Sequence, residues 1–186
     1  MKYVILLLVF FMAAPAMAQD RNLMVELDLD GVTGNGPDTI LVAPKDSVVV
    51  DVWVVWEGEA QHAGWDGFQI FIVDNGHLDF VDAELLMPSH WVPGTISESG
   101  DTVWISAFDF IFSGSPDPPQ QVFIVLYQAS LESGIASLGV DLEWSNWSAT
   151  WGPLVAFTGY VGATVVIDEP TSTEQTSWGG VKRLFR

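Results

Sequence analysis

The chain has 186 residues, of which 49% are apolar and 12% aromatic, and it contains no cysteine. It carries 24 Asp and Glu residues against 6 Lys and Arg residues, which gives a formal net charge of −18. This length and composition indicate one domain with a sizeable hydrophobic core. They argue against a nucleic-acid binder, which needs a basic surface, and against disorder, because acidic disordered chains are poor in aromatic residues.

The first 18 residues have the pattern of a secretory signal peptide. Lys2 supplies a positive charge, residues 3–14 form an apolar run, and Ala16-Met17-Ala18 fits the small-residue cleavage rule. That run is short for a bilayer span, so we expect no stable membrane span once it is cleaved. We expect a secreted or cell-surface protein, from a bacterium or archaeon, that is held together by packing because it has no disulfides.

The mature chain opens with a strand predicted at Met24–Leu29, and the acidic, glycine-rich segment Asp28–Asp38 overlaps its end. Ca²⁺ takes six to eight oxygen ligands, and carboxylates on such a loop can converge on it. The EF-hand template fails because Val32 occupies its fifth position. A solvent-facing turn is the simpler interpretation. The alternative is a calcium site whose ligands would be Asp28, Asp30, Asn35 and Asp38.

The clearest predicted strand is Ser47–Trp56, which is rich in β-branched and aromatic residues. If Asp51 faces water, the valines at the even positions from 48 to 54 face the core. Trp53 then lies on the outer side of the sheet.

Turn sequences such as Asp74-Asn75-Gly76 separate the remaining predicted strands, and Trp65 and Trp91 fall in predicted loops. Eight or nine strands without crossover helices predict an all-β fold over residues 19–168, an antiparallel two-sheet sandwich. The further strands are predicted at Phe68–Val73, Leu78–Ala83, Thr102–Phe110, Val122–Gln128, Ile135–Leu142, Leu154–Thr158 and Val161–Ile167.

Alternation along the strands places several aromatic side chains on the outside of the sandwich. Neighbouring outward aromatics would form an apolar patch, and such patches usually mark interaction sites. These candidate partner-binding residues are Trp53, Phe71, Trp104 and Phe108.

Three tryptophans cluster near the end of the body, at Trp144, Trp147 and Trp151. Planar indoles can stack on sugar rings or anchor a protein interface, so this cluster is a candidate carbohydrate-binding site. The competing interpretation is that the indoles close the end of the sandwich as part of its core.

Residues 169–177 are polar and read as a linker, and residues 178–186 form a basic, aromatic tail. The tail is similar to the short Trp-Gly-x-x-Lys endings of some secreted bacterial proteins, which suggests a sorting or attachment signal. A disordered end without function is the alternative. The residues that would serve attachment are Trp178, Lys182, Arg183 and Arg186.

Five short patterns follow one another along the body of the chain, at 45–54, at 63–72 with its Gly-Phe-Gln strand, and at 77–84, 101–107 and 134–141. They occur in the order in which cohesin domains have them, so residues 24–168 resemble a cohesin-type β-sandwich, a fold related to some carbohydrate-binding modules. The chain departs from that family at Val73–Gly76, where cohesins have Tyr-Asp-Pro.

Catalysis finds little support in the sequence. The three histidines form no metal-binding pair, no Gly-x-Ser-x-Gly elbow is present, and no pair of carboxylates stands out by its spacing. We therefore expect a non-catalytic binding module. The resemblance implies another extracellular protein as its partner, in adhesion or scaffolding, and a polysaccharide is the alternative. No cofactor is expected apart from the calcium discussed above.

Overall fold

The computed structural model describes residues 23–34, 36–56, 65–110, 118–149 and 154–168, and these form two β-sheets packed face to face. None of the described residues is helical, so no described helix could cross a bilayer. The predicted signal peptide, linker and tail lie outside the described residues.

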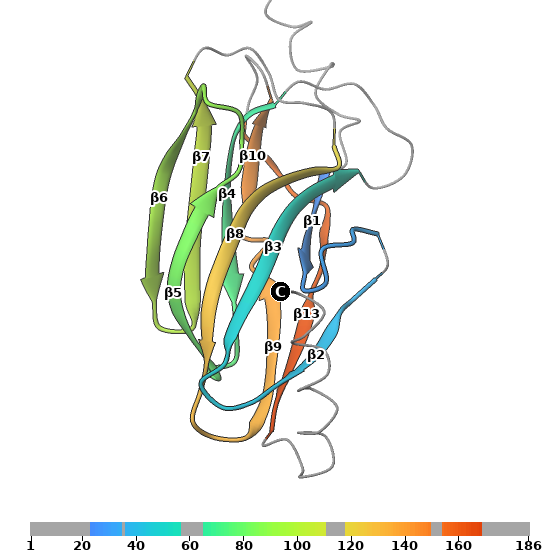
Figure 1. Ribbon diagram of the computed structural model, residues 1–186. Coiled ribbons are helices and arrows are strands. Elements are labelled where there is room, and N and C mark those ends of the chain that lie inside the picture. Colours follow the sequence, from blue (N-terminus) through green and yellow to red (C-terminus); the bar gives the residue numbers. More distant parts are fainter. Residues whose placement is uncertain (1–22, 35, 57–64, 111–117, 150–153, 169–186) are drawn as a thin grey trace, which may run out of the picture.

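The first sheet has five strands in the order β12-β1-β3-β8-β5. Figure 1 shows β3, β8 and β5 of this sheet in front. Only β12 runs parallel to its neighbour, β1, and the other pairs are antiparallel. The strands are β1 (Leu23–Asp28), β3 (Ser47–Trp56), β5 (Leu78–Leu85), β8 (Gln120–Ala129) and β12 (Gly159–Val161).

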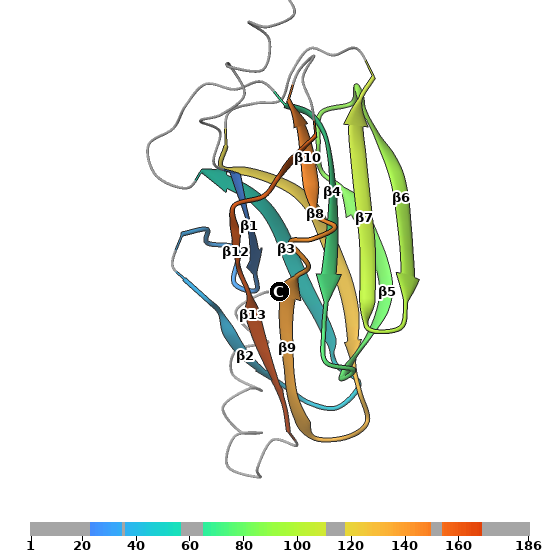
Figure 2. The same cartoon turned by 180° about the vertical axis from the view of Figure 1, so that it is seen from behind.

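The second sheet has eight strands and is built around β4, which pairs with β7 along one edge and with β10 and β9 along the other. In Figure 2, β4, β7, β9 and β13 face the viewer. The outermost strands are β6, beyond β7; β11, beyond β10; and β2, which runs parallel to β13. Its strands are β2 (Thr39–Val42), β4 (Trp65–Val73), β6 (Trp91–Ser99), β7 (Thr102–Asp109), β9 (Gly134–Val140), β10 (Asn146–Ala149), β11 (Leu154–Ala156) and β13 (Ala163–Ile167).

The core lies between the sheets and follows the two-residue period of the strands. Val48, Val50, Val52 and Val54 are each at most 1% exposed, while Asp51 and Trp53 are half-buried on the opposite side of β3. The predicted orientation of β3 is therefore confirmed. The same alternation on β4 and β7 buries Phe68, Ile70 and Ile72 against the other sheet, together with Val103, Ile105 and Ala107.

The sandwich prediction is confirmed, but the sequence reasoning underestimated the number of strands. The short strands β2, β10 and β12 and the long strand β6 were not predicted. Trp65 and Trp91 were expected in loops, and this was wrong, because they begin β4 and β6 and are 0% and 4% exposed. Their rings contact each other in the core, with centroids 5.2 Å apart.

The segment between β1 and β2 carries the chain from one sheet to the other. Its ends are tied by the Leu29 amide, which donates to Asp38 Oδ2 over 2.8 Å. The Thr164 amide of β13 donates to the Asp38 carbonyl and so fixes Asp38 against the second sheet. Gly31 and Gly34 have φ near +80°, which most other residues avoid, and their amides donate to carboxylates on β1.

Candidate functional site

The outer face of β4, β7 and β6 carries three cross-strand rows of side chains. The middle row is polar, with Asn146 of β10 opposite Gln69 of β4, and Gln69 opposite Ser106 of β7. The row on one side of it contains two aromatic residues, and the row on the other side contains one. The face therefore presents hydrogen-bonding groups between apolar contacts, a mixture that is common at protein interfaces.

The first aromatic row is Phe71 opposite Trp104. Their rings are stacked, with centroids 5.3 Å apart and an interplanar angle of 12°. Both are half-buried, and the Ser145 hydroxyl accepts a hydrogen bond from the Phe71 amide. Alternation along each strand predicted both side chains on the outside, and the structure has them there; their pairing across β4 and β7 was not predicted.

The second aromatic row contains Phe108, which is 45% exposed and lies opposite both Gly67 of β4 and Val92 of β6. Gly67 leaves no side chain beside the ring, and a Cβ there would come within 2.8 Å of the Ser148 hydroxyl. Val92 is 38% exposed, so it extends the apolar surface to the edge strand. We call Phe71, Trp104, Phe108 and Val92 the aromatic face.

Trp53 does not belong to this surface, which corrects the grouping made from the sequence. It lies on β3 of the other sheet, opposite Glu26 of β1 and Gln121 of β8. Alternation correctly placed it outside, but a period of two along one strand cannot tell which of two sheets the strand enters. Val92 was missed because β6 was not recognised as a strand.

The tryptophan cluster does not act as one group. Trp147 of β10 is completely buried opposite Phe68, so its ring cannot stack on a sugar, and we correct that part of the carbohydrate prediction. Trp144 is 59% exposed, and its carbonyl accepts hydrogen bonds from the side-chain amides of Gln69 and Asn146. Trp151 lies outside the described residues.

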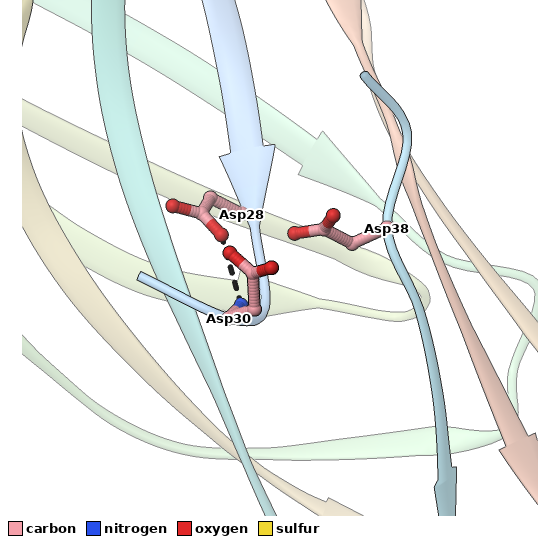
Figure 3. Close-up of side chains that lie close together, drawn as sticks. All are labelled: Asp28, Asp30 and Asp38. Carbon is pink, nitrogen blue, oxygen red and sulfur yellow. Dashed lines mark hydrogen bonds between the residues drawn. The ribbon is translucent and has the colours of Figure 1, made fainter. Parts of the chain in front are cut away.

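A second cluster lies at the end of β1, where Asp28, Asp30 and Asp38 each place a carboxylate oxygen within 4.8 Å of the others. Figure 3 shows the side chains of Asp30 and Asp38 pointing toward Asp28. Asn35, the fourth predicted ligand, lies outside the described residues. Three of the four residues named from the sequence are therefore brought together.

Asp28 is the buried member of this cluster, at 1% exposure. Its Oδ1 accepts hydrogen bonds from the amides of Asp30 and Gly31, at 2.9 and 3.0 Å. Burial raises the pKa of Asp28 to about 6, against the lowering effect of the Asp30 amide, and the nearby carboxylate of Asp38 raises it as well.

Comparisons with known proteins were made at the level of sequence and of structure. No protein-family model matches the chain, and no curated protein matches it. Solved structures do match. The sixth cohesin of scaffoldin B from Acetivibrio cellulolyticus, solved with a dockerin, is 11% identical with a TM-score of 0.59, over 79% of this chain and 99% of that one.

The fold is cohesin-like. The seventh type I cohesin of a scaffoldin from Pseudobacteroides cellulosolvens matches over 81% of this chain and 94% of its own, with a TM-score of 0.59 and 11% identity. A non-cellulosomal cohesin from the archaeon Archaeoglobus fulgidus matches over 83% and 97%, with a TM-score of 0.57 and 11% identity. The resemblance predicted from short sequence patterns is thus confirmed for the fold.

Proposed function

We propose that this protein is a secreted, non-catalytic module that attaches to another protein through its aromatic face. The observation that carries the proposal is the set of outward aromatic side chains Phe71, Trp104 and Phe108 on one sheet, of which Phe108 is 45% exposed. Aromatic anchors beside hydrogen-bonding groups supply much of the affinity of protein interfaces.

The cohesin-like fold supports this class of function. Among the similar solved structures, two cohesins from Clostridium thermocellum were solved as cohesin–dockerin complexes, at 10% and 11% identity to this chain. For this chain we propose a protein partner and a contact surface, and we leave the partner's family open.

The strong negative charge of this chain indicates which charge the partner's surface should carry. Between Asn22 and Val181 the only Lys or Arg is Lys45, against 23 acids, so this stretch carries a formal charge of −22. A partner that meets the aromatic face should therefore carry basic residues around an apolar contact, because like charges would slow association and weaken it. Binding should weaken as salt is added.

A capture experiment tests the proposal. The immobilised full chain is exposed to the extracellular proteins of its source organism and compared with two variants, Phe108→Asp and Val49→Asp. Val49 is a matched control because it is 49% exposed on a strand of the other sheet. We expect Phe108→Asp to lose a captured protein that wild type and Val49→Asp retain, with all three equally stable. Equal capture by all three chains would refute the aromatic face as the contact.

A second candidate function, carbohydrate binding, rests on Trp144, which is 59% exposed and whose backbone carbonyl accepts hydrogen bonds from the side-chain amides of Gln69 and Asn146. An exposed indole can stack on a sugar ring, and amide side chains nearby can hydrogen-bond the sugar's hydroxyls. A glycan array separates the two proposals. Binding that is lost in Trp144→Ala and kept in Phe108→Asp would favour the polysaccharide partner.

A further inference from the structure

The acidic cluster at the end of β1 contains an oxygen for which the described residues provide no partner. Asp28 Oδ2 is buried and accepts no hydrogen bond from the described part of the chain. Its partner oxygen Oδ1 accepts two amides, so the carboxylate is satisfied on one side only. An ionised group that is buried and half-satisfied is costly, and it normally pairs with a cation or a metal ion.

Within the described part of the chain, no Lys or Arg side chain is placed to supply that charge. Lys45 is the only Lys or Arg between residues 23 and 168, and it lies in the turn where its amide pairs with the Ala129 carbonyl. The nearest charges to Asp28 are other acids. Asp38 and Asp30 lie in the cluster, and Asp51 is directly opposite on β3. Three other carboxylates thus lie near Asp28, whose buried Oδ2 accepts no hydrogen bond from the described residues.

We infer that Asp28, Asp30 and Asp38 bind a calcium ion. Two oxygens bound to the same Ca²⁺, at about 2.3–2.6 Å each, lie no more than about 5.2 Å apart. The three carboxylate oxygens meet this limit, since all lie within 4.8 Å of one another. A cation that contacts both oxygens of Asp28 would supply the partner that Oδ2 lacks.

The three proposed ligands lie in or next to strands of both sheets, so a bound ion would stabilise the fold. Asp28 ends β1 of the five-stranded sheet, and Asp38 directly precedes β2 of the eight-stranded sheet. Figure 3 shows the two side chains coming from separate parts of the chain, with Asp30 on the segment that follows β1. Calcium at this position would link the two sheets and hold the 29–38 segment, so binding should stabilise the native state.

The test is calcium binding by the full chain after metal removal with a chelator. Isothermal titration with CaCl2 and thermal unfolding with and without 2 mM CaCl2 are measured for wild type and for Asp28→Asn, Asp30→Asn and Asp79→Asn. Asp79 is an exposed acid on β5 and serves as the matched control for loss of one charge. Asp30→Asn is included because Asp30 is exposed, so this variant should fold even if Asp28→Asn does not.

We expect wild type and Asp79→Asn to bind one calcium ion and to unfold at a higher temperature with CaCl2. Asp28→Asn and Asp30→Asn should bind at least ten-fold more weakly. Absence of binding by wild type at 2 mM CaCl2, or equal affinity in all four chains, would overturn the inference and leave a carboxylate pair that shares a proton. Neither result depends on the protein partner proposed above, because the titration contains none.

Discussion

Trp144 and Trp147 lie three residues apart, and the structure gives them opposite roles that substitution can separate. Trp147 is completely buried between the sheets, whereas Trp144 is 59% exposed. We predict that Trp147→Ala strongly destabilises the protein and that Trp144→Ala leaves its stability almost unchanged.

The magnitude follows from the buried area of the indole. A buried aromatic side chain hides about 150–250 Å² of surface, which at about 25 cal/mol per Å² is about 4–6 kcal/mol. Measured costs of Trp→Ala in cores are about 3–5 kcal/mol, because the site relaxes in part. No hydrogen bond adds to the loss, since the Trp147 Nε1 has no partner among the described residues.

Urea and thermal unfolding followed by tryptophan fluorescence and circular dichroism measure both variants. For a domain of this size, about 3–5 kcal/mol corresponds to a fall in Tm of about 6–20 °C. Trp144→Ala should stay within about 0.5 kcal/mol of wild type, as exposed substitutions usually do. A Trp147→Ala variant as stable as wild type, or an equal loss in both, would contradict the core that we describe.

Three further predictions concern the sandwich itself. Gly162→Ala should lower the free energy of unfolding, measured in urea, by about 1–3 kcal/mol. The added Cβ would lie 2.5 Å from the Leu138 carbonyl oxygen, so the backbone must move, and an unchanged stability would argue against this close approach. Tyr127→Phe should leave the free energy of unfolding unchanged or raise it by up to about 1 kcal/mol, because the buried Tyr127 hydroxyl has no partner within the described residues. A loss above about 1 kcal/mol would indicate that this hydroxyl does make a hydrogen bond. Burial raises the pKa of Asp74, so the native state binds its proton more tightly than the unfolded chain, and this group's contribution to stability falls as pH rises from about 4 toward neutrality. Asp74→Asn should flatten that slope in unfolding curves measured between pH 4 and 7, and an unchanged or steeper slope would contradict the assignment.

The strands that the sequence predicted best are long and show one clear period. Ser47–Trp56 has the bounds that were predicted, because its valines alternate with Asp51 and a register slip would bury that charge. The strands that were missed lack this signal. β2 and β10 have four residues each, and β6 contains Pro93 and Gly94, which ordinarily mark a turn. β6 pairs with β7 across an irregularity between Pro93 and Ile96. This pairing depends on the tertiary structure and cannot be read from the local sequence.

The candidate sites were predictable to different degrees for a similar reason. The acidic cluster lies within eleven consecutive residues, so the local composition was enough to predict Asp28, Asp30 and Asp38 as candidate metal ligands. The aromatic face joins β4, β6 and β7, and its members could be grouped only once the sheet order was known. That order separates Trp53 from Phe71 and Trp104, although all three follow the same outward alternation.

Site-specific photo-crosslinking tests most directly whether the aromatic face is the contact surface. A benzophenone side chain is introduced at position 108 or at position 49, which are exposed to similar extents on opposite sheets. After irradiation with the captured protein, we predict a covalent adduct from position 108 and none from position 49. An adduct formed from position 49 alone would place the interface on the five-stranded sheet and contradict the account.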